Sequence, residues 1–250
     1  MPAAALRGRV SAYYGFREET ASPIRRREGP GADIVVVVSF GEDWLIDGER
    51  FSSFAAGLRD RQVTTEHAGR SFGMQINVAP PAAAALFGIP LEELAYREVP
   101  LEDVLGEPFL AERLHDRATW QARFDLLNSV LARRFADALP PSAEVEWAWR
   151  RLVETGGRIR VDELATELGW SRKRIVARFR DHVGLPPKAV ARVLRFERAQ
   201  AAATQADRPD WTRIALECGY YDQSHLINEF RAITGRTPET FFQDAMAAAA

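Results

Sequence analysis

The sequence predicts an α+β protein, in which a β-rich N-terminal part with helices precedes an all-α part of two helix-turn-helix units. Three observations predict this order. Short β-branched runs occur in the first 80 residues, helical periodicity takes over after residue 80, and one helix-turn-helix pattern occurs twice in the last third. A chain of 250 residues is long enough to bury two cores.

Strands are predicted in the first 80 residues. Residues 34–40 form a β-branched run suited to a buried strand. Asp47 and Gly48 separate two apolar stretches, and this pair tolerates the positive φ angles of a tight hairpin turn. Apolar residues at positions 72, 74, 76 and 78 alternate with smaller or polar ones, which predicts a half-buried strand.

Helices are predicted after Pro80 and Pro81. Residues 82–87, 91–96 and 101–105 resemble short helices interrupted by glycine and proline, and a longer helix is expected over 119–138. That helix carries one apolar stripe, formed by Trp120, Phe124, Leu127, Leu131 and Phe135. We expect the stripe to pack on its own domain, with a homodimer seam as the alternative.

The prolines at 140 and 141 predict a linker over residues 138–142, because proline cannot continue a helix. We therefore expect an effector or oligomerisation domain over residues 1–139 and a second domain over residues 140–250.

Composition excludes several classes of protein. No run of 18 apolar residues occurs and the first residues lack the apolar core of a signal peptide, so neither a membrane partner nor secretion is expected. Cys218 is the single cysteine, so no intramolecular disulfide forms, which fits the cytoplasm. The net charge is −2, yet residues 158–198 hold 11 basic and 5 acidic side chains. Such a local excess suits contact with phosphates, although a solvated basic face has the same composition.

The repeat in the last third is the most informative feature. Residues 164–170 (LATELGW) match residues 214–220 (IALECGY), and the offset of 50 becomes 51 after the turn. Small residues allow two helices to cross closely, glycine suits a helix end with positive φ, and Ser171 and Asp222 suit the N-cap of the next helix. Each unit is thus helix, short turn, helix, over about residues 161–184 and 211–235, with a connecting helix from about 187 to 203.

The last third closely resembles the DNA-binding domain of the AraC/XylS family of bacterial transcription regulators. The resemblance covers about residues 142–245 and is sharpest over 214–231 and in Gly235-Arg-Thr-Pro238. It implies a two-part helical domain that reads two adjacent major-groove segments of double-stranded DNA. The N-terminal half is similar to effector domains of such regulators, some of which are cupin-like barrels. No residue of this half allows a ligand site to be assigned from that similarity.

Candidate DNA contacts follow from which face of each second helix is left exposed. Once Ile175 and Phe179 face the core, Arg172 and Lys173 lie toward guanine edges or phosphates. In the second unit, glutamine and asparagine suit adenine, and an isoleucine suits a thymine methyl group. The full set of predicted contacts is Arg172, Lys173, Arg174, Val176, Ala177, Arg178, Gln223, Ser224, His225, Ile227, Asn228 and Arg231.

Other functions were weighed against this one. The four histidines have no metal-ligand spacing, and no phosphate-binding glycine loop or nucleophile elbow occurs, so no metal, cofactor, catalytic residue or enzyme activity is predicted. Cys218 is expected to be a buried small apolar residue. The alternative function is a ligand-sensing or protein-interaction module without specific DNA binding. A small-molecule effector, a homodimer and, for an activator, RNA polymerase are the further partners expected.

Overall fold

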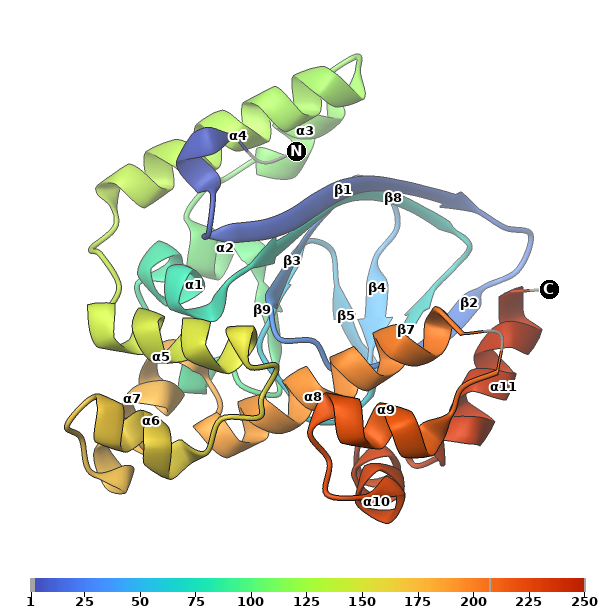
Figure 1. Ribbon diagram of the computed structural model, residues 1–250. Coiled ribbons are helices and arrows are strands. Elements are labelled where there is room, and N and C mark those ends of the chain that lie inside the picture. Colours follow the sequence, from blue (N-terminus) through green and yellow to red (C-terminus); the bar gives the residue numbers. More distant parts are fainter. Residues whose placement is uncertain (1–2, 207, 250) are drawn as a thin grey trace.

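The computed structural model describes residues 3–206 and 208–249, and its elements follow the predicted α+β order (Figure 1). The N-terminal part contains two antiparallel sheets. One has the strand order β1-β8-β3-β6-β9 and the other β2-β7-β4-β5. The strands are β1 (Val10–Glu19), β2 (Ile24–Glu28), β3 (Ile34–Ser39), β4 (Trp44–Ile46), β5 (Glu49–Phe51), β6 (Phe54–Ala56), β7 (Val63–His67), β8 (Arg70–Val78) and β9 (Glu98–Pro100).

Side chains of the larger sheet alternate between two environments. On β3, Val36 and Val38 belong to the main core under the helices, whereas Val37 belongs to a small cluster between the sheets. On β8, Met74 and Ile76 likewise face the helices. Because successive strand residues point to opposite faces, the odd-numbered positions of both strands face the second sheet.

The predicted hairpin is confirmed. Strands β4 and β5 pair with Ile46 opposite Glu49, and the two turn residues Asp47 and Gly48 have φ angles of 47° and 91°. Both angles are positive, as a two-residue turn of the hairpin type requires.

Short helices follow the sheets. They are α1 (Pro80–Phe87), α2 (Leu101–Leu105) and α3 (Leu110–His115), with 3-10 turns η1 (Ala4–Leu6) and η2 (Leu91–Glu93). The prediction of a helix over 91–96 was wrong beyond its first turn, because Tyr96 adopts a φ of 60°. There the chain turns back so that β9 can pair with β6, and it passes so close to Gly57 that a Cβ on this glycine would lie 1.9 Å from the Leu94 carbonyl oxygen.

The long helix α4 (Trp120–Asp137) crosses the outer face of the larger sheet (Figure 1). Thr119 caps it by accepting a hydrogen bond from the Ala122 N–H group. Its apolar stripe packs on the protein itself, as expected. Leu127 is buried, and Phe124 stacks on Tyr13 with ring centroids 5.1 Å apart.

The last part is helical: α5 (Ala143–Glu154), α6 (Val161–Glu167), α7 (Arg172–Val183), α8 (Pro187–Thr204), α9 (Trp211–Cys218), α10 (Gln223–Thr234) and α11 (Pro238–Ala249). The main core continues from the sheet through α5 to α7 and ends at Leu194 on α8. From Phe196 onward the residues form a second cluster with α9 and α10. The first helix-turn-helix unit therefore shares its core with the N-terminal part, while the second has its own.

Contacts also join the two parts at the surface. Helix α7 packs against α1 and η2. Arg192 on α8 forms an ion pair with Asp60 at 3.4 Å, and the Gln62 N–H group donates to the Ile233 carbonyl oxygen at 3.0 Å. The helical part is thus held against the N-terminal part at several points along its length.

Candidate nucleic-acid interface

Helices α6 and α7 form the first helix-turn-helix unit as predicted. Leu164 and Ala165 are buried where α6 meets α7, and Gly169 takes a φ of 64° in the turn. Ser171 then begins α7 by accepting a hydrogen bond from the Arg174 N–H group at 3.2 Å. Such a cap satisfies a helix N–H group that has no partner within the helix.

Helices α9 and α10 repeat this construction. Ala215 is buried at the crossing, Gly219 takes a φ of 86°, and Asp222 caps α10 by accepting from the His225 N–H group at 2.7 Å. The second turn is one residue longer, as the shift from 50 to 51 indicates. Tyr221, which follows the residue equivalent to Trp170, is 87% exposed and directly precedes Asp222, the N-cap of α10.

On α7 the predicted contact residues occupy the exposed N-terminal half. Ile175 and Phe179 are fully buried, so this helix has a defined inner face. The C-terminal half docks on the N-terminal part, since Gly184 lies against Leu91. Exposed members of the predicted set are Arg172, Lys173, Arg174 and Ala177, and half-buried members are Val176 and Arg178.

Three arginines of α7 already have partners on the protein. Arg172 pairs with Asp162 at 2.8 Å, and its side chain remains 74% exposed. Arg178 pairs with Asp181 at 3.0 Å. The Arg174 guanidinium lies over the Trp170 ring, 4.5 Å from its centroid. Exposed ion pairs contribute little free energy, so a phosphate can take the place of a carboxylate in these pairs at small cost.

On α10 the inner face is formed by Leu226 and Phe230, which are fully buried. The predicted contact residues Gln223, Ser224, Asn228 and Arg231 are exposed, and His225 and Ile227 are half-buried. Two of these predicted contact residues also form hydrogen bonds within the second unit. The Gln223 side chain accepts a hydrogen bond from the Thr212 hydroxyl at 2.9 Å, and the His225 Nδ1 atom accepts from the Tyr221 N–H group at 3.2 Å.

Helix α8 connects the two units and fixes them to each other. The Arg195 Nη2 atom donates to both carboxylate oxygens of Glu229 on α10, at 2.7 and 3.0 Å. Its Nη1 atom donates to the Gly157 carbonyl oxygen, ahead of α6, at 3.2 Å. Only 14% of each of the two side chains is exposed. One guanidinium therefore joins the loop that leads into the first unit, the connecting helix and the second helix of the second unit.

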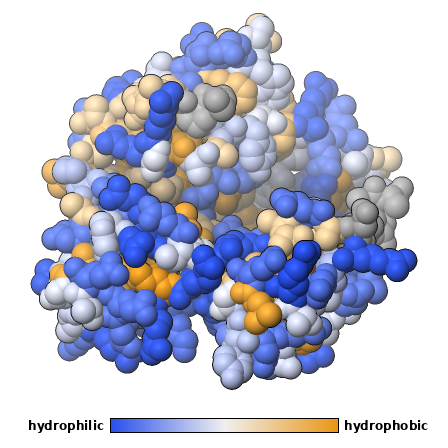
Figure 2. All heavy atoms as spheres, viewed as in Figure 1, coloured by the Kyte–Doolittle hydropathy of each residue, from blue (hydrophilic) through white to orange (hydrophobic). Residues whose placement is uncertain are grey.

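The surface at this end of the molecule is mainly hydrophilic. Figure 2 shows two lobes there, over the α5–α7 and the α9–α10 regions, with a hollow between them. The two helix-turn-helix regions thus form separate, mainly polar protrusions in this view.

The predicted contact set did not include Tyr221, although its side chain is exposed next to the second unit's recognition helix. The extra residue in the second turn was the available signal, because a residue inserted into a tight turn is forced outward. Reasoning from sequence also missed a cavity between the two sheets, whose lining includes Asp33, Arg59 and the α8 residue Glu197. No pattern in the sequence joins residues so far apart.

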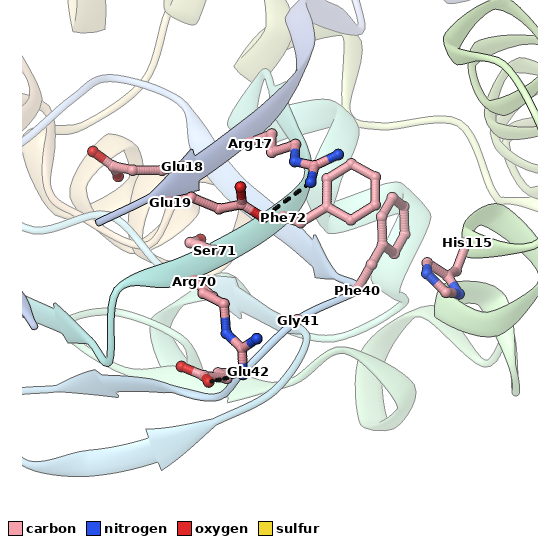
Figure 3. A pocket seen from close by; sticks show the side chains of 10 residues that line it. All are labelled: Arg17, Glu18, Glu19, Phe40, Gly41, Glu42, Arg70, Ser71, Phe72 and His115. Atoms are coloured by element: carbon pink, nitrogen blue, oxygen red, sulfur yellow. Dashed lines mark hydrogen bonds and ion pairs between the residues drawn. The ribbon is translucent and has the colours of Figure 1, made fainter. Parts of the chain in front are cut away.

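A second, open pocket lies outside the sheets, between β1, β8 and α3 (Figure 3). Its lining includes Phe40, Phe72 and His115, together with the pairs Arg17–Glu19 and Arg70–Glu42, and the Arg17 guanidinium lies beside the Phe72 ring. Figure 3 shows the Glu18 side chain pointing away from Arg17 and Phe72. The two ion pairs of this pocket each join oppositely charged side chains of its own lining.

Cys218 is buried in the second unit, and burial raises the pKa of its thiol. We expect it to react slowly with a thiol reagent in the folded protein and rapidly in denaturant, because the thiolate is the reactive form. Timed alkylation followed by mass spectrometry measures both rates. Equal rates in the two states would contradict a buried, structural role.

Within residues 3–206 and 208–249, no helix is long and apolar enough to cross a membrane. The same residues contain no cluster of three side chains suited to hold a metal ion.

Comparison with known proteins agrees with this geometry. A family model described as a helix-turn-helix domain matches residues 164–244, which run from within α6 through α10. None of the curated proteins matches the sequence.

Solved structures of ToxT from Vibrio cholerae share the fold along nearly the whole chain. An apo variant is 9% identical, with a TM-score of 0.52 over 94% of this chain and 98% of that one. ToxT bound to an unsaturated fatty acid is 10% identical, with a TM-score of 0.51 over 94% and 96%. ToxT bound to a methylnaphthalenyl butenoic acid is 8% identical, with a TM-score of 0.53 over 92% and 98%. Residues 164–244 therefore match a helix-turn-helix domain, in a chain that shares its overall fold with ToxT.

Proposed function

We propose that this chain is a sequence-specific DNA-binding transcription regulator whose helices α7 and α10 read two adjacent major-groove segments. In this proposal residues 140–250 bind DNA and residues 1–139 receive a signal. One observation carries it. Two capped helices, each buried on one face and open at its polar N-terminal half, are held together through α8 and Arg195.

The residues divide by chemistry into readers and phosphate contacts. Arg172 and Lys173 suit guanine edges or phosphates, while Gln223 and Asn228 suit adenine. Arg174, Arg178, His225 and Arg231 suit phosphates, whose contacts fix the position of the protein without reading sequence. Val176, Ala177, Ser224 and Ile227 complete the two surfaces, with Ile227 suited to a thymine methyl group.

An effector fits the same architecture. Figure 1 shows α8, the helix that joins both units, running along the edge of the sheets. The cavity between the sheets is bounded on that side by the α8 residues Glu197 and Gln200. ToxT structures with bound carboxylic acids show that a protein of this fold can hold a small molecule. We propose that ligand binding in the cavity changes how α8 docks and so changes DNA affinity. A homodimer and a contact with RNA polymerase remain predictions.

Selection of bound sequences from a random DNA library tests the function. The selection is run near physiological salt, where non-specific phosphate binding is weak. Enrichment of two short motifs about one helical turn apart is expected from two reading helices. A single short motif would contradict reading by both helices. No enrichment, with or without cell extract as a source of effector, would favour a ligand-sensing module without specific DNA binding.

Asn228→Ala is expected to weaken binding at only a few base positions, by about 1–3 kcal/mol, because an asparagine amide pairs with one adenine. Arg178→Ala serves as the comparison. It is expected to weaken binding to every sequence and to reduce the salt slope by about 1. Fluorescence anisotropy on the selected site and on single-base variants measures both. An equal loss on all sequences for Asn228→Ala would refute its assignment as a reader.

A further inference from the structure

The space between the two sheets is a cavity of about 520 Å³, a size typical of small-molecule sites. Its walls come from strands of both sheets, and α8 closes one side with Glu197 and Gln200. Part of the wall is apolar, with Val37, Ile46 and Phe54 in one cluster. The remainder carries most of the charged groups, and their pairing determines what the cavity can hold.

Both arginines that line the cavity are already neutralised. The Arg26 Nη1 atom donates to Glu18 at 2.8 Å, and a second bond joins the same two side chains. Arg59 pairs with Glu98, and only 10% of each of these side chains is exposed. An acidic ligand that separated the Arg59–Glu98 pair would leave a carboxylate buried without its partner, which is costly. The Arg26–Glu18 pair is more exposed and costs less to separate.

Two carboxyl groups at the α8 side have no such partner. Asp33 accepts a hydrogen bond from the Ser11 hydroxyl at 2.5 Å, and Glu197 accepts from the Ala32 N–H group at 3.1 Å. Neither forms an ion pair within the part of the chain that the structure describes. Burial raises the pKa of both groups, and with the nearby charge of Asp33 it raises that of Glu197 to about 7. Two adjacent carboxyl groups that repel each other provide a place for positive charge.

A second observation points to a ligand in the same cavity. Ser71 is 1% exposed, and its hydroxyl has no hydrogen-bond partner among the described residues. It lies on the same face of β8 as Gln75 and Asn77, which also line the cavity, so its hydroxyl points inward. The Trp44 Nε1 atom is likewise buried without a partner in the described chain and lines the same space. Buried polar groups of this kind ordinarily have partners.

Resting on the proposed function, we propose that the effector of this regulator is a small organic cation, whose ammonium or guanidinium group lies between Asp33 and Glu197. Its apolar portion extends toward Val37, Ile46 and Phe54. Ser71 lies six strand positions from Asn77, at the other end of the cavity, and contacts only a longer ligand. The ligands named for the ToxT structures are carboxylic acids, whereas the ligand proposed for this chain is a cation.

Such a ligand would act directly on the DNA-binding part. Asp33 belongs to the N-terminal part, whereas Glu197 belongs to the helix that carries both reading units. A cation between them replaces a repulsion by two attractions and tightens the docking of α8 on the sheets. The occupied cavity therefore favours one relative position of the two parts.

Binding is tested on the full chain with matched probes of graded size. Primary amines from butylamine to 2-phenylethylamine and 2-(1-naphthyl)ethylamine are each compared with the isosteric carboxylate and alcohol. Thermal shift and calorimetry are expected to show at least one amine binding about tenfold or more tighter than both of its counterparts. A preference for carboxylates or alcohols throughout, or no shift with any amine up to about 10 mM, would overturn the proposal.

The Glu197→Gln variant tests whether the amine binds beside Glu197. Glutamine can still accept the hydrogen bond from the Ala32 N–H group, while the negative charge is lost. Amine affinity is expected to fall about tenfold or more. The matched control is Glu66→Gln, a residue whose side chain pairs with exposed Arg25, and its amine affinity is expected to stay unchanged. Unchanged binding by Glu197→Gln would overturn the proposal.

The melting temperature of the ligand-free protein gives an independent test of the unpaired carboxylate of Glu197. A raised carboxyl pKa means that wild-type stability falls as pH rises from about 4.5 to about 7. The variant lacks this loss, so its melting temperature should exceed that of wild type at pH 8 and approach it at pH 4.5. An equal difference at both pH values would count against an unpaired carboxylate in the cavity and so against the proposal.

DNA affinity measured on the same samples separates this inference from the proposed function. Amine binding without any DNA binding refutes the regulator and leaves the ligand class supported. Specific DNA binding with no amine binding refutes the ligand class alone.

Discussion

Phe230→Ala is expected to lower the free energy of unfolding of the second helix-turn-helix unit by about 3–5 kcal/mol, the usual cost of deleting a buried aromatic ring. Phe230 is fully buried, and its ring centroid lies 4.7 Å from that of Phe196 and 6.2 Å from that of Trp211. Few residues outside the second cluster share this core, so the loss falls on α9 and α10. Binding to a two-part DNA site should be lost with it.

The matched control is Phe179→Ala, the equivalent position in the first unit. Phe179 is also fully buried, but it lies in the core that continues into the N-terminal sheets. Circular dichroism melting should therefore show a new low-temperature phase for Phe230→Ala and a shift of the main transition for Phe179→Ala. The same single shifted transition for both variants would contradict two separate cores.

Arg195→Ala is the second change with a large expected effect. It removes both bonds to Glu229 and the bond to Gly157, and leaves a carboxylate of low exposure without its guanidinium. We expect a loss of about 3 kcal/mol in the free energy of unfolding, because breaking a buried pair costs more than the pair contributes. Urea unfolding measures this loss.

The effect of Arg195→Ala on DNA binding tests its role as a link between the two units. Affinity for a two-part site should fall more than affinity for either half alone, since the spacing of α7 and α10 is no longer held. The double variant with Glu229→Leu should regain much of the stability, because no charge is then left buried, but not the two-part affinity. Full recovery of both properties would show that Arg195 affects only stability.

Local signals in the sequence predicted the helix-turn-helix units closely. Ser171 and Asp222 cap their helices, and Gly169 and Gly219 take the positive φ angles expected of them. These features depend on residues within four positions of each other, so a linear pattern can encode them. The hairpin at Asp47 and Gly48 was predictable for the same reason.

Sequence patterns were weaker guides where distant residues decide the outcome. Residues 91–96 have helical character, yet the chain there turns at Tyr96 so that β9 can reach β6. The predicted contact residues on α7 proved to lie on the half that does not dock on η2. Periodicity identifies which face of a helix is apolar, but not which element will cover it.

The sequence alone thus determined that a β-rich part precedes two helix-turn-helix units, and which faces of α7 and α10 are exposed, because short-range spacing sets caps, turns and apolar faces. Tertiary structure alone decided that Arg195 joins the loop before α6 to α10 and that Asp33 lies beside Glu197. Those contacts bring together groups up to 165 positions apart, as between Ala32 and Glu197. Only the pairing of the strands and the docking of α8 on them place such groups within reach of each other, and no local pattern encodes that arrangement.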